Sequence, residues 1–110
     1  MEPVIEERVG VELDEDGLLV DHSSWSVTVA RDMALSLGVG DLTEDHWFVI
    51  DALREHYRKY GVAPAMSSIC HSHGKKWDWT HDLFQSCLNA WRIAGLPNPG
   101  EEAKSYLSGM

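Results

Sequence analysis

Residues 92–99 read Arg-Ile-Ala-Gly-Leu-Pro-Asn-Pro, and this stretch marks the place where a helix must stop. Gly95 lacks a Cβ and can adopt the left-handed backbone conformation that closes many helices. The two prolines that follow cannot continue a helix, because proline lacks the backbone N–H that an interior turn requires. Few apolar side chains come after them. The sequence therefore predicts a domain over 1–96 and a flexible C-terminal arm over 97–110.

Upstream of this stop, the apolar pattern predicts about four helices between residues 25 and 95. The first has apolar side chains four residues apart from Trp25 to Leu37. The strongest begins after Thr43, a good N-cap residue, and ends before Gly61. Its apolar stripe is formed by Trp47, Ile50, Leu53, Tyr57 and Tyr60.

The two remaining helices are expected between this long helix and Gly95. A short one starts at Pro64 and stops at Gly74, so that it forms a helix-turn-helix-like pair with the long helix. The last is predicted as a single helix, capped by Thr80 and continuing to Ala94.

The N-terminal segment shows a different periodicity. Val9, Val11 and Leu13 alternate with other residues, and Gly17 suits a tight turn before a returning apolar run. This pattern predicts a β-hairpin over about 9–20. The acidic residues around it lack the spacing of a calcium loop and are interpreted as a solvated face. The expected fold class is therefore mostly α: one small domain with a hairpin, a helical core and an arm.

The composition excludes several classes of function. Eighteen acidic and nine basic residues give a net charge of −9, which disfavours binding to nucleic acid and to anionic membranes. No apolar run is long enough to span a bilayer. Two cysteines do not make a disulfide framework, so we expect a cytoplasmic protein with reduced thiols. The chain contains no recognisable catalytic motif, and we predict neither an enzyme nor a bound cofactor or metal.

Four stretches, in order along the chain, resemble one known family. They are 14–20 with Trp25, 42–65, Gly74–Lys76 with Leu83–Phe84, and 92–99. Each is a weak signal alone, but together they cover most of residues 11–99. The family is DsrC/TusE, small sulfur-relay proteins that include the gamma subunit of dissimilatory sulfite reductase and a carrier in tRNA thiolation. The resemblance implies the hairpin, the helical core and the arm described above.

The resemblance also implies where sulfur-carrying thiols would stand. Family members carry one cysteine near the end of the arm and, in some cases, a second directly before the Arg-Ile-Ala-Gly run. The corresponding residues here are Glu102 or a neighbour, and Trp91. We therefore predict a binding or regulatory variant whose arm docks on a sulfite reductase or a sulfur-relay partner. The expected binding residues are Arg92, Leu96, Pro97, Pro99, Glu101 and Glu102.

A sulfur carrier that uses Cys87 or Cys70 is the alternative. Carrier chemistry requires an exposed thiolate, whereas free cysteines are most often buried. Cys87 lies one helical turn before Trp91 and is expected to point inward with it. A disulfide between the two cysteines would need Cβ atoms about 4 Å apart, a distance that the sequence does not determine.

Three further patterns suggest other binding sites. Cys70, His71, His73, His81 and Cys87 have ligand types suited to zinc but not the spacing of a known finger. A DNA-binding regulator is the weaker functional alternative, because the second helix of the helix-turn-helix-like pair carries no Arg or Lys. Lys75 and Lys76, flanked by tryptophans, are a candidate contact for an anion.

Overall fold

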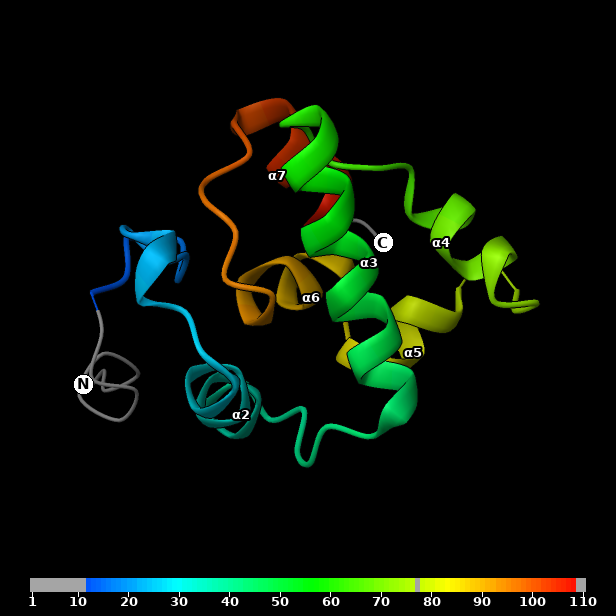
Figure 1. Ribbon diagram of the computed structural model, residues 1–110, viewed down its shortest axis with the longest axis horizontal. Helices are drawn as coiled ribbons and strands as arrows, with labels where there is room; N and C mark the ends of the chain where they lie inside the picture. The colour runs from blue at the N-terminus through cyan, green and yellow to red at the C-terminus, as the bar shows by residue number, and fades with distance from the viewer. Residues whose placement is uncertain (1–11, 77, 109–110) are drawn as a thin grey trace.

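The computed structural model describes residues 12–76 and 78–108, which form six α-helices and one 3-10 turn (Figure 1). The elements are η1 (His22–Ser24), α2 (Val27–Ser36), α3 (Glu44–Tyr60), α4 (Met66–Ser72), α5 (Trp79–Phe84), α6 (Cys87–Ile93) and α7 (Glu101–Ser108). The predicted mostly α class is confirmed. Among these residues, no helix has both the length and the apolar content needed to cross a bilayer.

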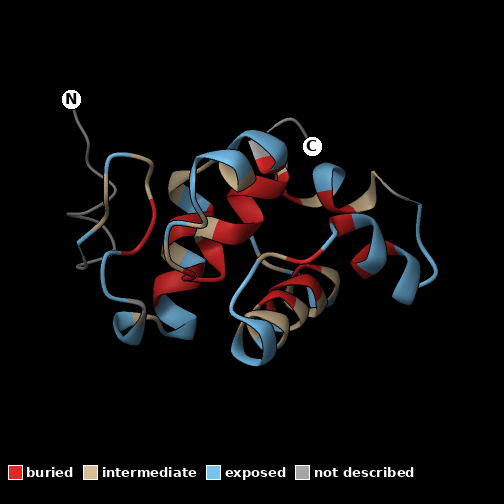
Figure 2. Ribbon diagram, turned by 90° about the horizontal axis from the view of Figure 1, so that it is seen from above, coloured by how far each residue is buried: buried red, intermediate tan, exposed pale blue. Residues whose placement is uncertain are grey.

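Helix α6 is the centre of the molecule. It packs against α2, α3, α5 and α7, and Figure 2 shows the buried residues gathered in the interior, where the helices meet. All of its side chains except Arg92 are buried, including Leu88, Trp91 and Ile93. A helix that is apolar on nearly all sides can be stable only when other elements surround it. The four neighbouring helices provide this cover.

Helix α3 follows the sequence prediction closely. It starts directly after Thr43 and is closed by Gly61, whose φ of 69° is left-handed. The Thr43 backbone N–H donates to Nδ1 of the buried His46 at 3.0 Å. The His46 Nε2 lies 2.9 Å from the Leu83 carbonyl oxygen, which can only accept, so the ring proton is on Nε2. The predicted stripe is wrong at Tyr60, which is largely exposed at the helix end.

The predicted single helix over 80–94 is wrong, because the chain breaks it into α5 and α6. Gln85 has a φ of 72°, the only positive φ at a non-glycine residue in the described chain. Ser86 then caps α6, its Oγ accepting from the Asn89 N–H at 3.1 Å. The Gln85 side-chain amide donates to the Gly38 carbonyl at 2.8 Å. This hydrogen bond links the turn between α5 and α6 to the loop between α2 and α3.

The predicted hairpin is reduced to a tight turn in the described residues. One antiparallel bridge joins Leu13 and Leu19, and Gly17 takes a φ of 80° between them. The Asp14 carboxylate accepts the backbone N–H groups of Asp16 and Leu18 at 2.8 and 3.0 Å. This side-chain cap closes the turn in place of a longer ladder. Residues 9–11 of the predicted hairpin lie outside the described residues.

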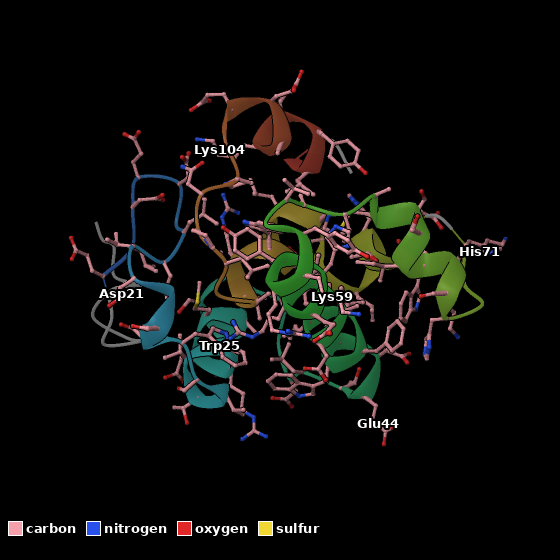
Figure 3. All side chains as sticks on the ribbon, turned by 45° about the horizontal axis from the view of Figure 1, so that its top comes forward. Asp21, Trp25, Glu44, Lys59, His71 and Lys104 are labelled. Atoms are coloured by element: carbon pink, nitrogen blue, oxygen red, sulfur yellow. The ribbon has the colours of Figure 1, made fainter. Side chains whose placement is uncertain are left out.

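The C-terminal segment differs from the expected flexible arm, because residues 101–108 form helix α7. Leu107 is fully buried, and the Tyr106 hydroxyl accepts the Met66 N–H at 3.2 Å. The Lys104 ammonium lies 2.6 Å from the Asp16 carboxylate, and Figure 3 shows this side chain extending toward the N-terminal turn. These contacts stabilise a helix that is too short to persist alone.

We expect Lys104→Met to loosen α7 selectively. The Lys104 side chain is only 12% exposed, so losing its pair with Asp16 removes a sheltered, charge-assisted hydrogen bond. Hydrogen exchange of the backbone amides in 101–108 should become faster while exchange in α3 is unchanged. Lys59→Met is the matched control, since Lys59 makes an exposed contact of 3.7 Å with Glu55. Equal exchange in both variants would contradict a fastening role for Lys104.

Candidate functional site

The end of α6 is held by side chains from two distant segments. The Trp25 indole N–H donates to the Ile93 carbonyl at 2.8 Å, and the Arg54 guanidinium donates to the Ala94 carbonyl at 2.7 Å. Arg54 also stacks on the Trp25 ring, with its guanidinium carbon 3.9 Å from the ring centroid. Gly95 follows with a φ of 73°, as the sequence predicts. This junction directs the chain from α6 toward α7.

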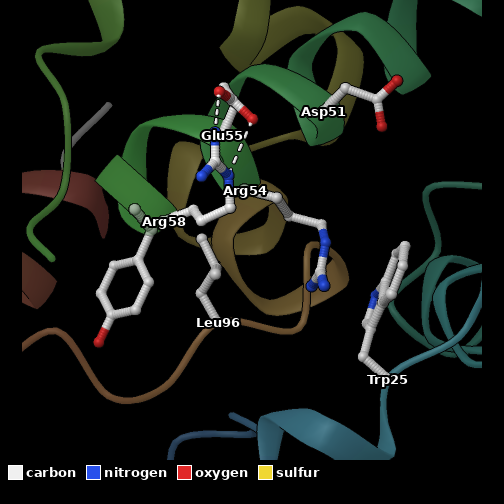
Figure 4. Close-up of a pocket in the computed structure, with 7 residues that line it drawn as sticks. Trp25, Asp51, Arg54, Glu55, Arg58 and Leu96 are labelled. Carbon is white, nitrogen blue, oxygen red and sulfur yellow. Dashed lines mark hydrogen bonds and ion pairs between the residues drawn. The ribbon is translucent and has the colours of Figure 1, made fainter. Parts of the chain in front are cut away.

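A first groove of about 640 Å³ opens beside the junction (Figure 4). Arg58 forms an ion pair with Glu55, its Nε 3.2 Å from the carboxylate, and Arg54 is occupied by the Trp25 ring and the Ala94 carbonyl. Burial lowers the pKa of Arg54, an effect that nearby Asp51 opposes. We name this pocket, lined by Trp25, Asp51, Arg54, Glu55, Tyr57, Arg58 and Leu96, the Arg54 groove. Its two arginines therefore already have partners within the protein.

A second groove of about 590 Å³ lies between the C-terminal end of α3 and the start of α7. Its walls come from Tyr57, from the turn at 61–63, from residues 98–103 and from Tyr106. We name it the α7 groove. The exposed carboxylates of Glu101 and Glu102 stand at its α7 side. It lies directly beside the position where the resemblance places a thiol on the arm.

The predicted binding residues separate into an inner and an outer group. Arg92 faces the interior, where it donates to the Asp16 carbonyl at 2.8 Å and to the Asn89 side chain at 2.7 Å. Leu96 is buried. The outer group reaches solvent and consists of the half-exposed Pro97 and Pro99 and the exposed Glu101 and Glu102.

Trp91, where the resemblance places the second thiol, is a core residue. It is fully buried and meets Tyr57 edge to face, with ring centroids 5.9 Å apart. Its indole N–H donates to the Pro97 carbonyl at 2.8 Å, which ties the start of the C-terminal segment to α6. A side chain in this role supports the segment from beneath and does not meet solvent.

Comparison with known proteins identifies the family to which this chain belongs. The model of a family described as DsrC like protein matches residues 6–101. The chain belongs to the DsrC/TusE family. The gamma subunit of dissimilatory-type sulfite reductase from Nitratidesulfovibrio vulgaris is 34% identical over 90 residues, which cover 80% of this chain and 86% of that protein.

A second relative and a solved structure agree with this assignment. The sulfurtransferase TusE of Buchnera aphidicola is 32% identical over 98 residues, covering 81% of this chain and 85% of that protein. The crystal structure of the oxidized gamma subunit (DsrC) from Archaeoglobus fulgidus superposes with a TM-score of 0.73 at 35% identity. That match covers 83% of this chain and 90% of the other. The DsrC fold is thus confirmed.

The two cysteines of this family member are poorly placed for carrier chemistry. Both are buried, with Cys87 2% exposed. The Cys70 sulfur lies 3.3 Å from the hydroxyl of the buried Thr80. Burial, helped by the neighbouring Cys70, raises the pKa of the Cys87 thiol to about 11. At neutral pH the reactive thiolate of Cys87 is therefore scarce as well as shielded.

We expect the neutral Cys87 thiol to make folding stability depend on alkaline pH. Its pKa is raised from 9.0 to about 11, so its contribution is complete below pH 9 and is lost as pH rises through about 11. The difference in free energy of unfolding between the wild type and Cys87→Ala should shrink over this range. Urea unfolding of both proteins at pH 8 and pH 11 measures it. A difference that stays constant would show that the thiol is not shielded.

The other candidate ligands are scattered over the α4–α5 surface. His73 stacks on Phe48 at 4.0 Å between centroids and lies 3.6 Å from the Asp45 carboxylate. Lys75 and Lys76 are exposed, with the Lys75 ammonium 5.8 Å from the Trp79 ring centroid. In residues 12–76 and 78–108, no three His, Cys, Asp or Glu side chains gather as a metal site requires.

The helix-turn-helix-like pair has no Lys or Arg side chain on its second helix, α4. Helix α4 packs against α5, and its exposed face presents Ser67, Ser68 and Ser72. None of these supplies the positive charge that anchors such modules to phosphates. A DNA-binding regulator therefore stays the weaker alternative.

Sequence reasoning missed the roles of Trp25, Arg54, Asp16 and Lys104. Trp25 and Arg54 reach the end of α6 across 68 and 40 residues, and Lys104 reaches Asp16 across 88. A local sequence pattern does not predict contacts between residues so far apart in the chain. The only local signal was Gly95, since a glycine that closes a helix also permits close approach of another side chain.

Proposed function

We propose that this chain is a binding member of the DsrC/TusE family that does not itself carry sulfur. It acts by docking its C-terminal segment on a sulfite reductase or a sulfur-relay complex and thereby regulates or blocks that site. The observation that supports this most strongly is the chemistry at the two thiol positions. Trp91 fills one of them inside the core, and Glu102 stands at or beside the other on the surface.

The packing of the C-terminal segment also favours a binding role. Pro97 and Pro99 restrict the backbone before α7, and a stiff segment loses less entropy when a partner binds it. Leu107 and Lys104 hold α7 on the domain, so a partner would meet the outer residues together with the end of α3. A location in the cytosol is part of the proposal, and two buried cysteines in the whole chain agree with it.

The names of the relatives indicate the partner class. One relative is the gamma subunit of dissimilatory-type sulfite reductase, and another is a sulfurtransferase. We therefore expect the purified sulfite reductase or sulfur-relay complex of the same organism to bind the immobilised full chain. Glu101→Lys/Glu102→Lys should weaken the binding, whereas the same charge change at Asp41 and Glu44 should not. Equal retention of the partner by both double variants would refute docking through the C-terminal segment.

The competing function is persulfide transfer by Cys87 or Cys70. Incubation of the folded protein with a sulfane donor, followed by intact-mass measurement, distinguishes the two functions. We expect no mass increment of a sulfur atom, and alkylation of both thiols only after denaturation. A transferable sulfur on either cysteine of the folded chain would replace the binding proposal with the carrier.

A further inference from the structure

The α7 groove combines apolar walls with exposed apolar side chains. Val62 is 59% exposed and Tyr106 is 43% exposed, and both line the groove. Tyr57, Ala63 and Pro99 complete its apolar surface. Large apolar side chains exposed in one concave region are typical of surfaces that receive another molecule.

The charges at this groove have one sign. Glu101 and Glu102 are the ionisable carboxylates among its described lining residues, which include no Lys, Arg or His. The Glu101 side chain is 94% exposed, and its carboxylate lies 3.0 Å from the Lys104 ammonium, whereas Glu102 forms no ion pair with another described residue. In the Arg54 groove, by contrast, Arg54 and Arg58 stand beside Asp51 and Glu55.

The cations in the last turn of α3 and in α7 already have carboxylate partners within the protein. Arg58, in the last turn of α3, is paired with Glu55. The Lys104 ammonium is held 2.6 Å from the Asp16 carboxylate, on the side of α7 that meets the N-terminal turn. Neither of them therefore fully neutralises the Glu102 side of the groove. A cationic side chain that enters the groove would therefore meet the carboxylates of Glu101 and Glu102 at its edge and apolar side chains at its base.

We propose that the α7 groove binds a basic segment of a partner protein, one that carries Arg or Lys beside an apolar residue. The long aliphatic stems of these side chains pack on apolar surface while their charged ends reach carboxylates. The tyrosine rings offer faces to which a guanidinium is attracted. A net charge of −9 adds a long-range attraction that speeds the encounter with a basic partner.

This inference rests on the proposed function, because it gives the charge of the partner that the C-terminal segment meets. The two can fail separately. If sulfite reductase is retained through Glu101 and Glu102 but basic peptides do not bind the groove, the proposed function stands and this inference falls. If basic peptides bind the groove while sulfite reductase and relay complexes do not, the inference stands and the partner class is wrong.

The test uses the full chain and a fluorescein-labelled eight-residue peptide of alternating arginine and leucine. We expect saturable binding by fluorescence anisotropy, and none with the peptide that has glutamate in place of arginine. Glu101→Gln/Glu102→Gln should raise the dissociation constant about fivefold, as two exposed charge contacts predict. The control Asp41→Asn/Glu44→Gln removes the same charge at the opposite end of α3, roughly 25 Å away by the rise of the helix. An equal loss in both double variants would overturn the proposal, because the attraction would then come only from net charge.

Glycine amide signals locate the peptide directly. Gly61 and Gly100 line the α7 groove, whereas Gly38 and Gly40 lie in the loop before α3. We expect titration with the arginine peptide to shift the NMR signals of the first pair and leave the second pair in place. The opposite pattern would overturn the assignment of the groove. Concentration-dependent dimerisation that shifts the Gly61 and Gly100 signals without peptide would overturn it too, because the occupant would then be a second copy of the chain.

Discussion

Gly95→Ala is expected to lower the free energy of unfolding by about 3 kcal/mol, the sum of a left-handed backbone penalty and an overpacking penalty. Gly95 has a φ of 73°, which an alanine adopts only with strain. A Cβ added there would lie 2.0 Å from Cδ1 of Trp25, well inside van der Waals contact. Trp25 would have to move, and its hydrogen bond to Ile93 and its stacking with Arg54 would be lost with it.

Gly61→Ala is the matched control for this variant. Its φ is 69°, yet an added Cβ meets nothing within 4 Å. We expect a cost of about 1 kcal/mol from backbone strain alone. Urea unfolding of both variants isolates the clash with Trp25 as their difference. In the Trp25→Ala background most of the extra cost of Gly95→Ala should disappear, because only the Cβ of residue 25, 2.9 Å from the added atom, remains in the way. Its full persistence would show that the close approach of the indole ring is not the cause.

Trp91→Cys, which puts a thiol where the resemblance places the second one, is expected to lower the free energy of unfolding by about 3 to 5 kcal/mol. Trp91 is fully buried, so the smaller side chain leaves a cavity beneath Tyr57. The Pro97 carbonyl also loses its hydrogen-bond donor. The variant should unfold at a lower urea concentration and release the start of the C-terminal segment.

Glu102→Cys provides the comparison at the arm position. Glu102 is exposed on α7, so we expect a change in unfolding free energy within about 0.5 kcal/mol. Its new thiol should be alkylated rapidly in the folded protein, while Cys70 and Cys87 stay protected. A Trp91→Cys variant as stable as Glu102→Cys would contradict the core role of Trp91.

Local signals in the sequence were sufficient where a helix carries its own caps and stripe. Thr43, Gly61 and the spacing of Ile50 and Leu53 predicted α3 at its observed bounds. Gly95 closes α6 as expected, because both the glycine and the prolines act within their own turn. The end of α6 was predicted for the same reason.

The break between α5 and α6 was missed because Gln85 takes a left-handed conformation that non-glycine residues seldom adopt. The Gln85 side chain compensates by bonding to Gly38, which lies 47 residues earlier. Helix α7 was missed for a related reason. Its stability comes from Leu107 in the core and from the pair between Lys104 and Asp16, and neither contact leaves a local pattern.

The candidate site was predicted only in part. The resemblance identified Trp91 and Glu102 as the positions without a thiol, and the outer residues Pro99 and Glu101 do line the α7 groove. The groove itself could not be foreseen, because its other wall is the end of α3. That wall comes beside α7 only when α6 is packed between its neighbours.

The position of α6 in the chain has a consequence for protein synthesis. The helix is synthesised after α2 and α3, and its end is completed by Trp25 and Arg54. Until α6 has been added, the emerging α2 and α3 lack the surface on which their apolar faces rest. These two helices therefore stay incompletely packed in that interval, and chaperones that cover exposed apolar residues can bind them.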